Sequence, residues 1–425
     1  MLDNESTSPF ISLLFPSQDT MADAVNEQQQ QQINEDYQLW KKTAPVLYDV
    51  VVTQNLTWPT LTCQWLPELS RDHGYTSQGL LIGTNTNDEE TNYTQFLSVD
   101  IPQADPLPTT TAQKARIYLV QQMEHPGEVN RARYQPSNPD IIATKTRDGP
   151  VLVYDRTNPL TPIRLTGHSK EGYGLAWNPH SGKSNHLLSA GFDHLICHWD
   201  IGLIADDKTP YQRYEAHTDC VEDVSWNATN DSVFASVADD KKLMIWDTRT
   251  GTSPTQKVQA HKAEINSVAF HPHQEWMIAT GSSDKTIGLF DTRKLGRKLH
   301  SFDMHDGEVH QVAWSPHDEP IIASAAMDRK IMIWDLRRIG EEQTPEDAED
   351  GPPELMFVHN GHTSRISEFD WNPLEPWMIA SAAEDNIIQV WQVCYDTIGR
   401  RAIRAKWDDL CDKPLGDTTW SKRKS

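Results

Sequence analysis

The chain has 425 residues, of which 37% are hydrophobic and 23% are charged. At roughly 150 residues per domain, this length allows two or three domains or one large repetitive domain. No apolar run approaches the roughly 20 residues that a membrane helix needs, so we expect a soluble protein. The 61 Asp and Glu outnumber the 38 Lys and Arg, which gives a formal charge of -23. Such a charge repels phosphate backbones and attracts basic partners, which disfavours direct binding to nucleic acid.

The N-terminal residues are acidic where a signal peptide has a basic region, and the first basic residue is Lys41. We therefore expect neither secretion nor mitochondrial import. Met1 and Met21 are both candidate start sites. The five cysteines lie far apart without a CxxC pair, which disfavours a disulfide scaffold and a structural zinc site. The sequence thus predicts a protein of a reducing compartment that binds no metal or other cofactor.

An N-terminal helix is the first predicted element. Residues 1–32, which end in five consecutive glutamines, have the composition of a disordered tail. In residues 33–44, Tyr37 and Trp40 fall on one helical face, and Pro45 follows as a helix breaker. We therefore predict a helix over residues 33–44 that packs on the domain that follows.

The next stretch, residues 45–120, contains short apolar runs such as VLYDVVVTQ, GLLIGTN and ARIYLV. These runs provide enough strands for one four-stranded sheet.

From residue 125 onward the sequence contains an internal repeat. Each copy opens with a histidine and has an aromatic residue nine positions later. A Ser or Thr then precedes an Asp by four positions, and a second aromatic residue follows that Asp by six. The histidines are His125, His168, His217, His261, His305 and His362. The distance from the histidine to the Asp is 23 residues in five copies and 25 in one, so the match is not a product of loose alignment.

Repeats of about 40–45 residues that contain short strands are typical of β-propellers. The pairs Gly167-His168 and Trp199-Asp200 resemble those of the WD-repeat family. In that family His, Ser or Thr, Asp and Trp form a hydrogen-bond network within each blade. An interpretation of His, Ser and Asp as a catalytic triad is disfavoured, because a catalytic site is built once and this constellation recurs six times.

The six repeats and the strands before them predict an all-β protein, a seven-bladed WD-repeat β-propeller over residues 45–395. We expect an N-terminal strand to close the ring by pairing with the last blade near Trp391. Phe290 replaces the tryptophan donor in one repeat, so that blade should have a weaker hydrogen-bond network.

An acidic insertion lengthens the interval between His305 and His362 by about thirteen residues relative to its neighbours. Residues 340–356 hold seven Asp and Glu and no basic residue. A solvated acidic loop is one interpretation. The Gly-Pro-Pro sequence and the apolar residues that follow favour another, in which insertion and N-terminal helix form a groove for an amphipathic helix bearing Arg or Lys.

Longer strings give a more specific match. INEDYQLWKK, LTWPTLTCQWLP, VEDVSW, ADDKKLMIWDTR and IGEEQTPEDAEDGPPEL closely resemble the retinoblastoma-binding, histone-chaperone WD-repeat family. The family includes the small subunit of chromatin assembly factor one and the histone-binding subunit of type B histone acetyltransferase. The resemblance, which runs from about Ile33 to Val393, implies a side groove that binds the first helix of histone H4. Its apolar floor would consist of Leu47, Val50, Phe357 and Val358, and its acidic lip of Asp347, Glu349 and Asp350.

A second surface is predicted at one mouth of the central channel. Positions three and five after each repeat histidine point to the same side of the innermost strand, and several of them are acidic. The resemblance implies that this top face holds the basic tail of histone H3 through Glu128, Glu171, Tyr173, Glu222, Asn266, Glu308 and Glu384. Pro126 and His310 depart from the family, which has Glu and Phe there. A solvated acidic rim without a ligand is the alternative.

Residues 396–425 form a basic C-terminal tail, with Lys422-Arg423-Lys424 as a weak nuclear signal. We predict a non-catalytic subunit that binds histones H3 and H4 in the nucleus and also in the cytoplasm. Its partners would be subunits of chromatin assembly, histone acetyltransferase, histone deacetylase, Polycomb or centromere-loading complexes. The alternatives are a ubiquitin-ligase substrate receptor and an enzyme.

Overall fold

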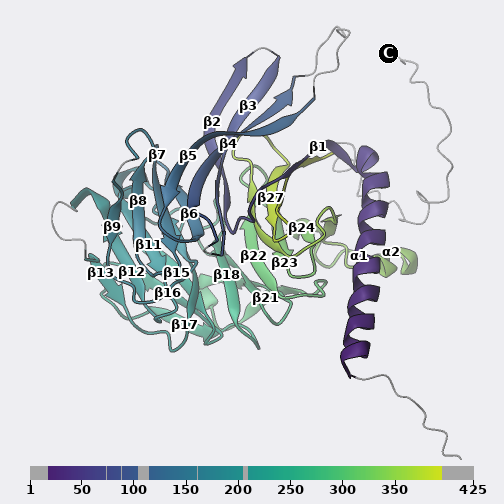
Figure 1. Cartoon of the computed structure of the whole chain (residues 1–425). Helices are drawn as coiled ribbons and strands as arrows, with labels where there is room; N and C mark the ends of the chain where they lie inside the picture. The colour runs from purple at the N-terminus through teal and green to yellow at the C-terminus, as the bar shows by residue number, and fades with distance from the viewer. Residues whose placement is uncertain are drawn as a thin grey trace, which may run out of the picture.

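The computed structural model describes residues 18–72, 74–87, 89–103, 114–159, 161–203 and 209–394. Within these ranges the chain forms a long N-terminal helix followed by strands that assemble into seven four-stranded sheets. The sheets form a ring of blades, and the helix lies outside the ring (Figure 1). The predicted fold class, a seven-bladed propeller with an N-terminal helix, is confirmed. No helix in the described part of the chain is long and apolar enough to cross a membrane.

Blades 1 to 7 follow the chain. Blade 1 contains β2 (Cys63–Asp72), β3 (Tyr75–Gly83), β4 (Asn92–Pro102) and β5 (Arg116–His125). Blade 2 contains β6 (Val129–Gln135), β7 (Asn138–Thr146), β8 (Val151–Asp155) and β9 (Ile163–Leu165). Blade 3 contains β10 (Leu175–Trp177), β11 (His186–Ala190), β12 (Ile196–Asp200) and β13 (Gln212–Tyr214). Blade 4 contains β14 (Val221–Trp226), β15 (Val233–Ala238), β16 (Lys242–Asp247) and β17 (Gln256–Gln259).

Blade 5 contains β18 (Ile265–Phe270), β19 (Met277–Ser282), β20 (Ile287–Asp291) and β21 (Lys298–Phe302). Blade 6 contains β22 (Val309–Trp314), β23 (Ile321–Ala326), β24 (Ile331–Asp335) and β25 (Leu355–His359). Blade 7 contains β26 (Ile366–Trp371), β27 (Met378–Ala383), β28 (Ile387–Val393) and β1 (Tyr48–Asn55). Short 3-10 helices cover Ser181–Lys183, Ile201–Leu203, Thr292–Lys294 and Leu336–Arg338, and α2 covers Pro345–Glu349.

Strand β1 closes the ring, because it is the outer strand of the last blade. It pairs antiparallel with β28, and Val51 lies opposite Trp391. The predicted closure near Trp391 is therefore confirmed. Because β1 belongs to blade 7, blade 1 is built entirely from β2 to β5. These strands are longer than those of most other blades and project beyond the ring in Figure 1.

The middle strands of the blades are buried on both faces, and their composition reflects this. All six residues of β23, with the sequence IIASAA, are buried. Small residues alternate with branched ones there because the neighbouring blades press on both sides of the sheet. The fully buried tryptophans Trp199, Trp246, Trp334 and Trp391 lie in the third strand of their blades.

The repeat histidine of each blade anchors a hydrogen-bond network. In blade 4, His217 Nε2 lies 2.7 Å from Ser236 Oγ, and its Nδ1 lies 3.1 Å from the Asp240 carboxylate. Trp246 Nε1 donates to the same Ser236 oxygen at 2.8 Å. Burial raises the pKa of Asp240, but the hydrogen bond from His217 outweighs this effect and lowers it to about 2. Blades 3 and 6 repeat the arrangement.

Blade 5 lacks one bond of this network. His261 Nε2 lies 2.8 Å from Thr280 Oγ1, but Phe290 offers no indole donor. The Thr280 hydroxyl donates instead to the Gly288 carbonyl at 3.4 Å, a long hydrogen bond. The expected loss at Phe290 thus involves the Trp-to-hydroxyl bond, while the bonds to the histidine remain.

Helix α1 is longer than predicted and spans Gln18–Leu47. Residues 18–32, which the prediction placed in a disordered tail, belong to the helix, whereas residues 1–17 lie outside the described ranges. Glutamine is a good helix former, and Gln31 donates to Glu35 four residues later at 2.9 Å. The composition that suggested disorder is therefore also compatible with a helix.

The C-terminal end of α1 also differs from the prediction, because Pro45 lies inside the helix. Proline removes one N–H donor from the helix, and α1 ends two residues later at Leu47. Pro45 thus marks the last turn rather than a stop. The C-terminal tail, residues 396–425, lies outside the described residues.

A buried carboxylate joins three blades at the centre of the ring. Glu368 of β26 is 1% exposed and forms ion pairs with Arg131 and Arg133 of β6. It also accepts hydrogen bonds from Thr62 Oγ1 at 2.9 Å and from the Cys63 backbone N–H at 2.7 Å. Burial raises the pKa of Glu368, but the two arginines outweigh it and hold that pKa below its usual range. Blades 7, 1 and 2 are thus connected through one side chain.

Candidate functional site

The C-terminal half of α1 is fixed to blades 6 and 7 by aromatic side chains. Trp40 is 3% exposed, and its Nε1 donates to Tyr48 Oη at 3.1 Å. Tyr48 Oη lies 2.8 Å from Nδ1 of the buried His359. Phe357 packs edge-on against the Tyr48 ring, with 5.4 Å between the ring centres. Burial lowers the pKa of His359 well below its usual range, so His359 is neutral at pH 7.

The end of α1 presents apolar side chains at the surface. Val46 is 60% exposed, and the half-buried Leu47 packs against the cluster that contains Phe357. Met356 packs against the same cluster. An ion pair at 3.8 Å joins Asp36 of α1 to Arg329 in the turn between β23 and β24. Helix α1 therefore lies along blade 6, the blade that carries the acidic insertion.

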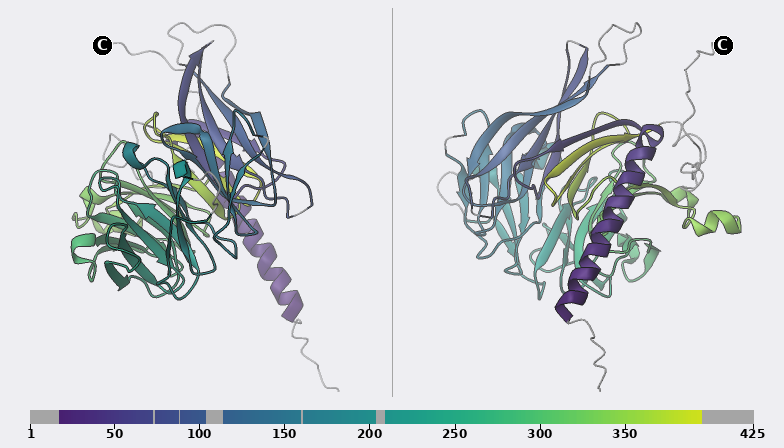
Figure 2. Two further views of the ribbon diagram at one scale, coloured as in Figure 1. Left: turned by 90° about the vertical axis from the view of Figure 1, so that its left-hand side faces the viewer. Right: turned by 45° about the vertical axis from the view of Figure 1, so that its right-hand side comes forward.

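The acidic insertion connects β24 to β25 and contains α2. Thr344 caps α2, because its Oγ1 accepts a hydrogen bond from the Asp347 backbone N–H at 3.1 Å. Helix α2 lies outside the ring on the same side as α1 (Figures 1 and 2). The residues predicted for the acidic lip, Asp347, Glu349 and Asp350, are all exposed. The insertion thus carries a locally ordered helix with its carboxylates at the surface.

The structure assembles only part of the predicted apolar floor. Leu47 and Phe357 share one cluster, but Val50 packs into the cluster between blades 7 and 1, and Val358 into the cluster between blades 5 and 6. Phe357 and Val358 are neighbours in β25, and successive strand residues face opposite sides. A bulge between Tyr48 and Val50 shifts the register of β1. Val51, rather than Val50, therefore faces the cluster with Leu47.

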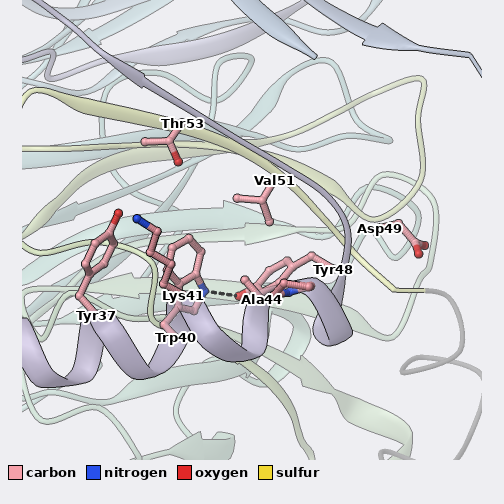
Figure 3. Close-up of a pocket in the computed structure, with 9 residues that line it drawn as sticks. Tyr37, Trp40, Lys41, Ala44, Tyr48, Asp49, Val51 and Thr53 are labelled. Atoms are coloured by element: carbon pink, nitrogen blue, oxygen red, sulfur yellow. Dashed lines mark hydrogen bonds between the residues drawn. The ribbon is translucent and has the colours of Figure 1, made fainter. Parts of the chain in front are cut away.

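A groove of about 590 Å³ lies between α1 and β1. Tyr37, Lys41 and Ala44 line it from the helix, and Val51 and Thr53 line it from the strand (Figure 3). Trp40 and Tyr48, joined by their hydrogen bond, also line it. The sequence-based prediction missed this groove because it depends on how the helix sits against an edge strand.

The top face brings several of its predicted residues together. Asn130 Nδ2 donates to Glu171 Oε2 at 3.3 Å, and Arg147 lies 3.8 Å from the Glu128 carboxylate. On the opposite part of the ring, Ser283 Oγ donates to Glu308 Oε2 at 3.3 Å. Ser283 Oγ also accepts from Asn266 Nδ2 at 3.1 Å. Glu384 follows β27, and its backbone N–H donates to the Arg365 carbonyl.

Electrostatic interactions link Glu222 to this acidic rim. Burial raises the pKa of Glu222 to about 8, and the neighbouring carboxylates Asp239, Asp223 and Glu171 raise it further against the opposing effect of Arg131. The Tyr173 pKa is also raised, first by burial and then by Glu171 and Glu222. Such a rim favours a ligand that brings positive charge.

One group of potential metal ligands also lies on this face. Ligand atoms of Asp219, Cys220 and Asp239 lie within 4.8 Å of one another. Burial raises the pKa of the Cys220 thiol to about 11, and acidic neighbours add to this effect. A protonated thiol is a poor metal ligand, so these residues do not support a metal centre.

Two family models match the sequence. One is described as histone-binding protein RBBP4 or a component of the CAF1 complex, and it covers residues 35–103. The other, the WD domain with its G-beta repeat, covers residues 208–247, 252–291, 296–335 and 353–392. The chain belongs to the RBBP4-like family of WD-repeat histone-binding proteins. The match at 35–103 includes the C-terminal part of α1 and β1, which form the site described above.

The WD matches show how the repeats of this family interlock in the ring. The repeat at 208–247 contains β13 of blade 3 and then β14, β15 and β16 of blade 4. Each matched repeat therefore supplies the outer strand of one blade and the three inner strands of the next. Membership of this family favours histone binding over the ubiquitin-ligase receptor considered from the sequence.

Proposed function

We propose that the chain is a non-catalytic histone-binding subunit that holds the first helix of histone H4 against α1 and the acidic insertion. The observation that carries this proposal is the histone-binding family match, which begins in α1 at residue 35. The same helix lies beside an insertion whose acidic side chains are exposed. An apolar strip and an acidic strip side by side suit a helix with one apolar face and flanking arginines.

The energetics require both strips. An exposed ion pair contributes only about 0.2–1 kcal/mol, so the acids alone would give weak and salt-sensitive binding. Burial of apolar surface adds about 25 cal/mol per Å². Val46, Leu47 and Met356 are the residues that we expect to supply this apolar contact, and Phe357 supports them from below.

The acidic top face supports a second part of the proposal, the binding of the basic tail of histone H3. Glu128, Glu171 and Glu222 lie in one electrostatic neighbourhood with Tyr173. The pKa of Glu222 is raised because this carboxylate lacks enough positive charge around it. An Arg or Lys side chain of a peptide would supply it.

The proposal places the chain in the nucleus, as a subunit of chromatin assembly, acetyltransferase, deacetylase, Polycomb or centromere-loading complexes. Support for a non-catalytic role comes from the repeated histidines. His168, His217 and His305 each use both ring nitrogens for hydrogen bonds inside their own blade. Their function is therefore structural, like that of the rest of the network.

The test measures binding of an H4 helix-one peptide to the full-length chain. The double variant Asp347→Lys with Asp350→Lys should lower the affinity at least tenfold, or about 1.4 kcal/mol. The matched control is Glu68→Lys with Glu89→Lys, two exposed acids of blade 1 and its loops, which changes the net charge equally. Equal losses in both variants would reduce the effect to overall charge, and unchanged affinity in the first would refute the proposed site.

A further inference from the structure

The groove between α1 and β1 is separate from the surface proposed for histone H4. Helix α1 lies between β1 and α2, so the groove and the acidic insertion flank opposite sides of the helix (Figures 1 and 2). The groove has a volume of about 590 Å³ and combines aromatic and aliphatic lining residues. Trp40, Tyr48 and Val51 form its inner part in Figure 3, and Lys41 and Thr53 stand at its rim.

The described chain ends beside this groove. The backbone N–H of Cys394, the last described residue, donates to the Leu47 carbonyl at 2.9 Å. Leu47 is followed directly by Tyr48 and Asp49, which line the groove. The next 31 residues of the chain, 395–425, therefore start at the rim of the groove.

The composition of this last segment fits an apolar groove on an acidic protein. Ile403, Trp407 and Leu410 are spaced by four and three residues, the spacing of one helical face. Eight Lys and Arg against five Asp and Glu give the segment a positive charge, whereas the whole chain has a formal charge of -23. Apolar side chains gain free energy by leaving water, and the opposite charges favour the same contact.

We propose that residues 395–413 fold back along α1 and fill this groove, with Trp407 as the main apolar anchor. The geometry allows it. The helix residues Tyr37 and Ala44 and the nearby Tyr48 span about 17 Å along α1, at about 1.5 Å per residue. The 13 residues from Cys394 to Trp407 cover about 20 Å as a helix and more than 40 Å when extended.

Such docking would clamp α1 between blade 7 and the C-terminal segment. Because the segment is tethered at the rim, its effective concentration is about millimolar, and a weak contact is enough to keep it bound. The opposite flank of α1, with Val46 and Leu47, would stay available. The inference does not depend on the identity of any partner of that flank.

Limited trypsin digestion of the full-length chain, followed by mass spectrometry, tests the proposal. Cleavage after Arg400, Arg401, Arg404 and Lys406 should be at least tenfold slower than after Lys422 and Arg423. Thr53→Arg puts a long charged side chain into the groove and should remove this protection. Asn55→Arg is the matched control, since it lies on the same exposed side of β1 two residues beyond the groove. It should leave the protection intact.

A second pair of variants tests the anchor. Trp407→Ser should remove the protection, and Trp420→Ser should not. Equal cleavage at both sets of sites in the unmodified chain would overturn the proposal. Protection that survives both Thr53→Arg and Trp407→Ser would do the same. Protection that disappears on dilution, together with a dimer mass in sedimentation, would show that a second copy fills the groove and would also overturn it.

Discussion

Tyr48 connects α1 to the propeller, and its hydroxyl offers a direct test of how the helix is held. The hydroxyl accepts a hydrogen bond from Trp40 and contacts His359, at 3.1 and 2.8 Å. Tyr48→Phe removes the oxygen and keeps the ring that packs on Phe357. Both partners are buried, with Trp40 at 3% and His359 at 0% exposure, so water cannot replace the lost bonds.

The magnitude follows from these two bonds. Leaving one buried polar partner without its hydrogen bond costs about 1–3 kcal/mol, so two cost about 2–4 kcal/mol together. The cost applies to the docking of α1 more than to the blades, because Trp40 belongs to the helix. At 1.4 kcal/mol per factor of ten, local opening of α1 should increase about 30- to 1000-fold.

Hydrogen exchange of the α1 amides from Asp36 to Leu47, measured by mass spectrometry, reports this opening. Tyr37→Phe serves as the control, since it keeps the ring that stacks on Trp40 at 5.5 Å. The control should exchange like the unmodified protein. If Tyr48→Phe exchanged no faster than Tyr37→Phe, the hydrogen-bond chain from Trp40 to His359 would not be what fixes α1, and the argument would be refuted.

Two further predictions concern charged groups. Glu368→Gln should destabilise the propeller by about 3–5 kcal/mol in urea unfolding, because it leaves Arg131 and Arg133 buried without their carboxylate; Glu375→Gln, which breaks an exposed pair with Arg71, should cost less than about 1 kcal/mol, and equal effects would contradict the role of Glu368. The pKa of Glu222 is about 8, so this side chain is mostly protonated at pH 7. A bound cation favours the charged form, and binding therefore releases a proton. The affinity for an H3-tail peptide should thus rise about tenfold from pH 6.5 to 8.5, and Glu222→Gln should abolish the rise in a fluorescence titration; the same pH profile in both proteins would contradict the assignment.

The ring could be predicted from the sequence because its main signals are local and repeated. The spacing from His217 to Asp240 corresponds to two side chains that meet at 3.1 Å, and the other repeats use the same distance along the chain. Closure near Trp391 followed from the need to cover a sheet edge, and Val51 lies opposite this residue. In both cases one physical requirement left a single economical arrangement.

The side site was predicted less completely because it depends on register. A bulge after Tyr48 turns Val50 away from Leu47 and brings Val51 toward it, and the spacing of apolar residues does not reveal such a bulge. Val358 could have been excluded, since it is adjacent to Phe357 in one strand and must face the other side.

The central charge cluster was not predicted at all. Glu368 and Arg133 are 235 positions apart in the chain, and they meet only because the ring closes. The length of α1 was underestimated for a different reason. A glutamine-rich segment has the composition of both a disordered tail and an exposed helix, and composition alone does not separate the two.

Hydrogen exchange of the full-length chain with and without a saturating H4 helix-one peptide tests the central claim most directly. The account predicts slower exchange in two segments, the end of α1 from Leu39 to Leu47 and the insertion with β25 from Glu341 to Val358. The other blades should be unaffected. Protection confined to the channel mouth or to blades 2 to 5, with no change in α1 or the insertion, would contradict the account.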